Sequence, residues 1–195
     1  MAERVPASLE SALADLMGWL DAAHIPSMII GGVAASVLGR PRLTQDVDAL
    51  AILAESDCAE AVRVAAQYNI VPRIDDVLRF AERTRVLLMR HVTSGVDIDV
   101  TLGELQFERA AVAQCENLHI GGINVRLPRV EDLLVMKAIA RRPKDIEDLK
   151  GLLAAHPDAD VARARRWVRE FATAMSTPDM LQEFEALLSE RTLKR

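Results

Sequence analysis

The spacing of apolar residues changes near Pro128, and this change constrains the fold more than any other feature of the sequence. Before it, short apolar runs bounded by glycine or proline alternate with segments of helical spacing, which predicts strands and helices in turn. After it, every remaining segment repeats apolar residues at intervals of three and four, as amphipathic helices do. We therefore expect an α+β fold with an α/β core over residues 1–128 and a helical region over residues 129–195 packed on it as a small bundle.

The same patterns predict the individual elements. Apolar runs predict strands at residues 27–30, 46–53, 85–89 and 95–102, the last two as an antiparallel pair, and a hairpin with a two-glycine turn at 118–125. Helical spacing predicts helices at residues 7–24, 33–38, 55–68, 104–116, 129–140, 144–154, 161–174 and 178–188.

Composition excludes several functional classes. With 24 Lys+Arg against 29 Asp+Glu, the net charge is −5, so bulk electrostatic coating of nucleic acid is not expected and any polyanion site must be local. The two cysteines form no CxxC pair, which argues against a disulfide framework or a structural zinc site. No apolar run approaches the length of a membrane span or a signal peptide, so we expect no membrane partner and a cytoplasmic location.

Two pairs of aspartates carry the chemical signal. Asp46 and Asp48 stand two residues apart on a predicted strand, so their side chains point to the same face, and Asp97 and Asp99 repeat the pattern on another strand. Adjacent carboxylates repel each other unless a cation joins them, and Mg²⁺ is bound by one or two carboxylates together with substrate phosphates. If the strands are neighbours, a three-carboxylate cluster could support two metal ions and phosphoryl-transfer chemistry.

A double glycine precedes the first of these strands. Gly31 and Gly32 follow an apolar run and open a predicted helix, where bare backbone N–H groups and the helix dipole can accept a phosphate oxygen. A tight turn alone would explain them equally well. Neither the P-loop nor the dinucleotide-binding glycine pattern occurs in the chain.

Taken in order, these motifs resemble a known superfamily. The double glycine, the helix and the segment from Arg40 to Asp48 resemble the GG/GS…DxD signature of the DNA polymerase beta-like nucleotidyltransferases. Downstream, the segment 132–149, with its KxxA…R.KDxxDL pattern, resembles that of AbiEii-type minimal nucleotidyltransferases, which include toxins of toxin–antitoxin and abortive-infection systems. The resemblance spans residues 27–153 and implies a mixed sheet flanked by helices.

The resemblance also implies roles for individual residues. It assigns the metal, Mg²⁺ or Mn²⁺, to Asp46, Asp48 and Asp99, with Asp97 as the rival third carboxylate. Further catalytic positions fall on Lys137 and Asp148. The nucleotide would contact the set Gly31, Gly32, Arg42, Thr44, Lys137 and Lys144, although serine often replaces the second glycine in active members.

A structural interpretation of the later charged residues stands beside this one. Lys137 and Arg141, and likewise Lys144 and Asp148, are spaced as solvated charge pairs on helix faces. In an acidic protein, however, basic residues concentrated on both sides of the acidic motif could neutralise a triphosphate or receive RNA; these are Arg40, Arg42, Lys137, Arg141, Arg142 and Lys144.

The expected function is Mg²⁺-dependent transfer of a nucleoside monophosphate from an NTP to an acceptor hydroxyl, with release of pyrophosphate. The acceptor remains open between a tRNA end, a protein hydroxyl and a small molecule such as an antibiotic. Two alternatives remain: a nucleotide-binding module of the same fold whose chemistry has lapsed, and a protein that acts with an antitoxin or another partner chain.

Overall fold

The computed structural model describes residues 7–193. The strands are β1 (Ser27–Ile30), β2 (Asp46–Ala51), β3 (Ile70–Pro72), β4 (Val86–His91), β5 (Asp97–Leu102), β6 (Glu116–Ile120) and β7 (Ile123–Leu127). The α-helices are α1 (Ala7–Ala22), α2 (Gly31–Leu38), α3 (Cys58–Ala65), α4 (Val77–Thr84), α5 (Gln106–Ala113), α6 (Val130–Ala140), α7 (Pro143–Ala155), α8 (Val161–Ala174) and α9 (Pro178–Leu193). Within this range, no helix combines the length and apolar character needed to span a membrane.

The chain divides into two compact units. The first contains the residues up to Val33 together with Leu43–Pro128, and the second contains Ala34–Arg42 together with the chain from Arg129 onward. Helix α2 therefore begins in the first unit, and its later turns group with the second.

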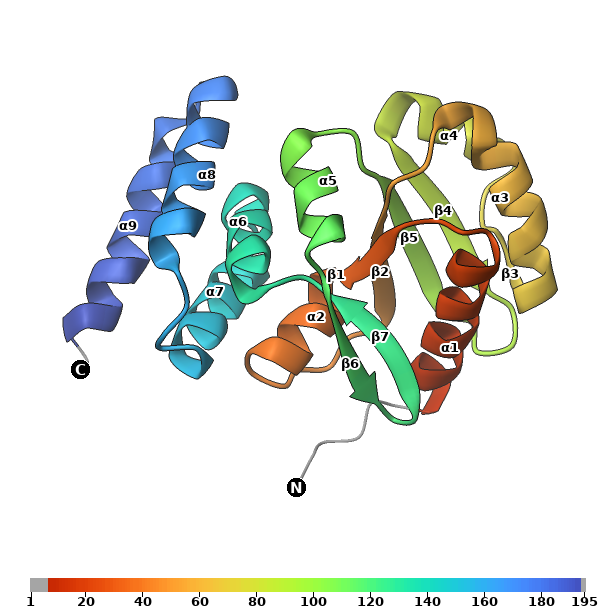
Figure 1. Cartoon of the computed structure of the whole chain (residues 1–195), viewed down its shortest axis with the longest axis horizontal. Coiled ribbons are helices and arrows are strands. Elements are labelled where there is room, and N and C mark those ends of the chain that lie inside the picture. Colours follow the sequence, from red (N-terminus) through yellow and green to blue (C-terminus); the bar gives the residue numbers. More distant parts are fainter. Residues whose placement is uncertain (1–6, 194–195) are drawn as a thin grey trace. The chain divides into compact units, whose positions relative to one another are not determined.

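A mixed five-stranded sheet in the order β1-β2-β5-β4-β3 forms the centre of the first unit (Figure 1). β2 and β5 are parallel, and the other neighbouring pairs are antiparallel. In β5, buried apolar residues alternate with half-buried Asp97, Asp99 and Thr101, so one face of this strand enters the core and the other carries polar groups.

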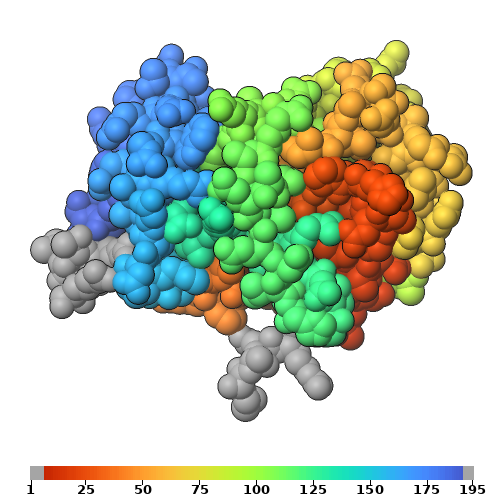
Figure 2. Space-filling model, in the orientation of Figure 1, coloured from red at the N-terminus to blue at the C-terminus, as the bar shows by residue number. Residues whose placement is uncertain are grey.

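In the first unit, helices and the β6–β7 hairpin pack around this sheet. α1 contacts β2, β7 and α3, and its buried Trp19 donates a hydrogen bond from Nε1 to the Ala61 carbonyl of α3 at 2.9 Å. The β6–β7 hairpin turns at two glycines of positive φ, Gly121 and Gly122. Figure 2 shows this hairpin at the surface beside α1, where a Cβ on Gly121 would meet the Glu10 carboxylate.

The second unit is helical. α6 contacts α7 and α8, while α9 packs against both α7 and α8 (Figure 1). The segment 34–42 belongs to this unit through specific contacts: His156 Nε2 hydrogen-bonds with the Leu38 carbonyl, and Arg42 pairs with Asp148. The division expected from the sequence, an α/β core over residues 1–128 with a helical region over residues 129–195 packed on it, stays a prediction.

The α+β fold class expected from the sequence is confirmed, as are the antiparallel β4–β5 pair and the two-glycine hairpin. Two elements were missed, the short strand β3 and the helix α4. β3 spans three residues and ends at a proline, so it offers too little alternation to detect. α4 is only eight residues long, combines four apolar residues with Arg79, Glu82 and Arg83, and ends at Arg85 in the left-handed region.

Trp19 and Trp167 provide a matched pair for testing the packing of the first unit. Replacing buried Trp19 by phenylalanine removes its hydrogen bond and leaves a void, and we expect a loss of about 1–3 kcal/mol in the free energy of unfolding. Trp167 on α8 is only half-buried, so Trp167→Phe should cost less than about 1 kcal/mol. Urea titrations followed by circular dichroism measure both, and equal losses would contradict the assignment of Trp19 to the core.

Candidate active site

The parallel pairing of β2 with β5 brings four aspartates together. Asp46 lies beside Asp97 and Asp48 beside Asp99 in the register of the two strands. Residues paired across neighbouring strands share a face, as do residues two apart along one strand. All four carboxylates therefore project from one face of the sheet, at the edge where β2 and β5 both begin.

Two arginines from the adjoining strands bind the β5 carboxylates. Arg73 follows β3, and its guanidinium spans both aspartates, with Nη1 2.9 Å from Asp97 Oδ2 and Nη2 2.7 Å from Asp99 Oδ1. Arg90, paired with Asp97 across the β4–β5 ladder, donates from Nε to Asp97 Oδ1 at 2.7 Å. Asp97 is thus held by two arginines, whereas Asp99 shares one of them.

The electrostatics separate the two β5 carboxyls. The hydrogen bond from Arg90, helped by Arg73, holds the pKa of Asp97 below its usual range. Burial raises the pKa of Asp99, and the carboxylates of Asp48 and Asp46 raise it further against the opposing charge of Arg73. The β2 aspartates are therefore close enough to Asp99 to act on it, and a cation at this face would relieve their repulsion.

Asp48 also lies against the start of α2. Gly31 has a positive φ of 65°, and any Cβ at this residue would overlap the Asp48 carboxylate. The N-terminus of a helix carries unpaired N–H groups and partial positive charge, so it favours an anion at this place. Gly31 is required here by both backbone conformation and space, and Gly32 is buried in the same turn. The structure thus places a carboxylate where the sequence predicts a phosphate.

Thr44 is positioned by the first aspartate, because its hydroxyl donates to Asp46 Oδ1 at 3.0 Å. The contact orders the segment that leads into β2, and it occupies one oxygen of the exposed Asp46 carboxylate. A role for Thr44 in nucleotide binding stays a prediction.

Whether these residues suit a divalent metal depends on their donors. Carboxylate oxygens are the ligands that Mg²⁺ prefers, and Mg²⁺ usually takes only one or two of them from the protein. In the part of the chain that the structure describes, no group of three or more Asp, Glu, His or Cys side chains is arranged to hold a metal ion. The donor set of Asp46 and Asp48 thus fits one Mg²⁺ that completes its coordination with phosphate and water.

A second ionic cluster lies in the helical unit and collects three other predicted residues. Lys137 on α6 donates from Nζ to Asp148 Oδ2 at 2.7 Å and to Asp145 Oδ1 at 3.1 Å, both on α7. Arg42 donates from Nε to Asp148 Oδ1 at 2.8 Å, and Arg142 from Nε to Asp145 Oδ2 at 2.6 Å. We call these five residues the α6–α7 ion network.

Burial defines the character of this network. The side chains of Lys137 and Asp148 are each 4 % exposed, and that of Asp145 is fully buried. Burial alone raises the pKa of Asp145, but hydrogen bonds from Arg142 and Lys137 outweigh it and hold this pKa below its usual range. The Lys137 ammonium that we expected at nucleotide phosphates is thus engaged by two buried carboxylates. The geometry gives it a structural function, and contact with phosphate stays a prediction.

The other basic residues differ in their surroundings. Arg141 forms an ion pair with Glu183 of α9. The distance between Arg141 Nε and Glu183 Oε2 is 2.9 Å. Lys144 is exposed on α7, and Asp148, its expected partner, is bound instead by Arg42 and Lys137. The predicted pairing of Lys144 with Asp148 is therefore wrong, because Asp148 faces the interior of the unit.

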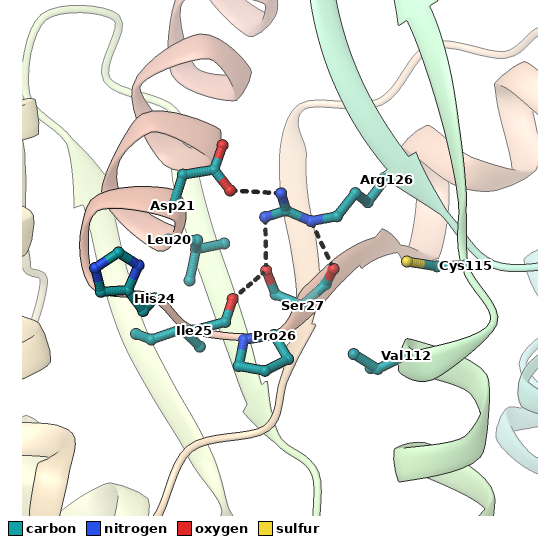
Figure 3. A pocket seen from close by; sticks show the side chains of 9 residues that line it. All are labelled: Leu20, Asp21, His24, Ile25, Pro26, Ser27, Val112, Cys115 and Arg126. Carbon is teal, nitrogen blue, oxygen red and sulfur yellow. Dashed lines mark hydrogen bonds and ion pairs between the residues drawn. The ribbon is translucent and has the colours of Figure 1, made fainter.

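A pocket of about 420 Å³ opens elsewhere in the first unit (Figure 3). Its polar wall is Arg126, whose Nε and Nη2 donate to the carbonyl and hydroxyl of Ser27 and whose Nη1 donates to Asp21. Ser27 lies at the opposite end of β1 from Ile30, the residue paired with Asp48. This pocket is therefore separate from the aspartate face, and its guanidinium is already bound to the protein.

Sequence reasoning missed Arg73, Arg90 and Asp145. Arg90 could have been found, because extending the expected antiparallel pair by one residue places it opposite Asp97. Asp145 stands three residues before Asp148 on the helix face that also carries buried Leu149 and Leu152, so the helical spacing of the apolar residues places it on the face that is buried. Arg73 left no signal, since it depends on the undetected strand β3.

Comparisons with known proteins identify the family of this chain. The model of a family described as a nucleotidyl transferase of unknown function (DUF2204) matches residues 9–183. The chain belongs to this family. The expected nucleotidyltransferase family is thus confirmed, while the DNA polymerase beta-like superfamily and the AbiEii-type branch within it stay predictions. No curated protein sequence matches the chain significantly.

Solved structures share the fold of this DUF2204 protein. An antigenic nucleotidyltransferase-like protein from Paracoccidioides brasiliensis has a TM-score of 0.55 at 16% identity, covering 95% of each chain. The antibiotic-resistance factor ANT(2'')-Ia has a TM-score of 0.57 at 13% identity, over 88% of this chain and 96% of its own. The lincosamide antibiotic adenylyltransferase LnuA, bound to lincomycin, has a TM-score of 0.52 at 10% identity, over 78% and 98%. At such identities the likeness concerns the fold alone.

The contact of Gly31 with Asp48 predicts a large effect of a single methyl group. Gly31→Ala combines a positive φ, which costs about 1–2 kcal/mol, with overlap of the carboxylate. Gly95→Ala has the same backbone strain at φ 70° but open space around its Cβ, so it is the matched control. We expect Gly31→Ala to lose about 2 kcal/mol more in unfolding free energy than the control. Adding Asp48→Ala to Gly31→Ala should restore that difference, and a purely additive double variant would contradict the contact.

Lys137 and Lys144 separate a structural from a nucleotide-binding function. Lys137→Met leaves two buried carboxylates short of a partner and should cost about 3–5 kcal/mol in unfolding free energy, whereas exposed Lys144→Met should change it by less than about 0.5 kcal/mol. Thermal unfolding and NTP titration of both variants provide the test. A stable Lys137→Met protein that has lost NTP binding would show that Lys137 contacts phosphate instead.

Proposed function

We propose that this protein transfers a nucleoside monophosphate from an NTP to an acceptor hydroxyl, releasing pyrophosphate, with Mg²⁺ (or Mn²⁺) at Asp46 and Asp48. The observation that supports this most is the register of β2 and β5, which sets the two DxD pairs side by side on one face. Family membership supports nucleotidyl transfer as the reaction class.

The residues of the first unit have distinct tasks in this reaction. Asp46 and Asp48 hold the cation, which when bound supplies charge stabilisation for the triphosphate and the leaving pyrophosphate. The start of α2 at Gly31 orients Asp48 and adds partial positive charge. Asp99 is partly buried and lies near Asp46 and Asp48. Its carboxylate adds a third negative charge to the electrostatic field around the acceptor hydroxyl. Catalysis of this kind depends mainly on positioning and electrostatics.

The nucleotide and the acceptor are chosen by surfaces beyond these aspartates. The printed titles of the structural relatives describe LnuA as an adenylyltransferase and ANT(2'')-Ia as an antibiotic-resistance factor. ATP and a small polyhydroxylated acceptor therefore enter our proposal as the first pair to test. A tRNA end or a protein hydroxyl, with a toxin function and an antitoxin partner, is the second.

Substitution of the aspartates tests the proposal directly. Asp46→Asn and Asp48→Asn should each lower label transfer from α-labelled NTP by about 10²–10³-fold or more, because a neutral amide binds the cation poorly. Asp75→Asn removes an exposed carboxylate of the same unit and should leave transfer unchanged. Antibiotics, total tRNA and total protein serve as acceptors in parallel, and calorimetry follows NTP binding.

The outcomes distinguish the alternatives. Asp99→Asn should cause a larger loss of transfer than Asp97→Asn, since Asp97 is neutralised by two arginines; the reverse order would exchange their functions. NTP binding without transfer to any acceptor would favour the lapsed nucleotide-binding module. The ion pair between Arg73 and Asp99 is the observation that favours this alternative.

A further inference from the structure

Among the residues that the structure describes, Arg73 is the one arginine whose guanidinium bridges the two β5 aspartates. Its Nη1 and Nη2 bind different carboxylates, at 2.9 Å and 2.7 Å. An arginine fork matches two carboxylate oxygens in a way that a lysine ammonium cannot, and such bonds to charged partners are stronger than neutral ones. The side chain is 22 % exposed, so it is partly sheltered from water and from screening.

The backbone of Arg73 is held in place by a hydrogen bond to the sheet. Arg73 follows directly after β3, and its N–H donates to the Leu88 carbonyl of β4 at 3.0 Å. Leu88 is in turn paired with Asp99 across the β4–β5 ladder. Arg73 therefore extends the sheet register by one position and lies on the same face as Asp99, with β4 between them.

The balance of charge between the arginines and the aspartates limits how many divalent cations this face needs. Arg73 and Arg90 together carry two positive charges, which balance the two negative charges of Asp97 and Asp99. Asp46 and Asp48 add two further negative charges at the start of β2. That number matches one divalent cation.

We propose that the Arg73 guanidinium takes the place of a second divalent cation at the β5 aspartates, so that this face binds one divalent cation, at Asp46 and Asp48, instead of two. This inference rests on the proposed function for the location of the first cation. It differs from the sequence-based expectation of a two-metal cluster, in which Asp99 is a metal ligand. Arg73 is then a positioning residue, which orients Asp99 without binding the metal.

The test counts bound Mn²⁺ on the full chain by the loss of its free EPR signal. The wild type should bind one Mn²⁺, and Arg73→Gln, which removes the charge but keeps a polar side chain, should bind two. Arg73→Lys retains the charge and should return the number to one. Arg79→Gln changes an exposed arginine on α4 and serves as the control, also with one.

Two further variants keep the inference testable if Arg73→Gln folds poorly. Asp99→Asn alone should still bind one Mn²⁺, whereas it should bind fewer if Asp99 is a ligand of the first cation. Arg73→Gln/Asp99→Asn should lose the second ion that Arg73→Gln gains. Circular dichroism verifies that each variant is folded, and the rise in melting temperature caused by Mn²⁺ should be largest for Arg73→Gln.

Each outcome separates this inference from the proposed function. A wild-type chain that binds two Mn²⁺ or none, or a folded Arg73→Gln that still binds one, overturns it. Label transfer by a wild type that binds two Mn²⁺ would uphold the proposed function and overturn this inference alone. One bound Mn²⁺ in the wild type and two in Arg73→Gln, without transfer to any acceptor, would uphold the inference and leave the reaction unsupported.

Discussion

Repulsion between like charges is the constraint around which the first unit is organised. The parallel register of β2 and β5 forces four carboxylates onto one face, an arrangement that costs free energy wherever they stay ionised. The structure offsets this cost locally, with Arg73 and Arg90 on the β5 pair and the start of α2 against Asp48. A fold that needs only stability gains nothing from such a face, which makes the four aspartates the candidate functional site of the first unit.

The aspartate face of the first unit and the α6–α7 ion network illustrate different uses of charge. Around Asp99 the carboxylate is only partly sheltered, and burial together with the neighbouring carboxylates raises its pKa above its ordinary range. In the α6–α7 ion network, by contrast, Asp145 has no exposure and its pKa is lowered by two fixed donors. Buried pairs of that kind are costly to break and fix the positions of the helices that carry them.

The sequence predicted the parts of the fold that repeat a local pattern. The DxD pairs, the double glycine and the amphipathic helices are all visible in spacing alone. The pairing of β2 with β5 stayed a condition, because alternation along one strand does not identify its neighbour in the sheet. Arg73 could not be placed because its position depends on β3, which is three residues long and pairs only at the sheet edge. Lys137 was visible as a residue, but its burial depends on the tertiary approach of α6 and α7, which helical spacing does not encode.

The assignment of residues 34–42 to the helical unit has an evolutionary consequence. These residues lie between β1 and β2 in the chain, yet Leu38 and Arg42 bond with His156 and Asp148. Recombination near Pro128 would replace the C-terminal helices by those of another protein. The segment 34–42 would then lose its own contacts, among them the ion pair of Arg42 with Asp148. The two pieces of the second unit are therefore interdependent, and a chimaera between relatives should keep these contacts only when it transplants both pieces.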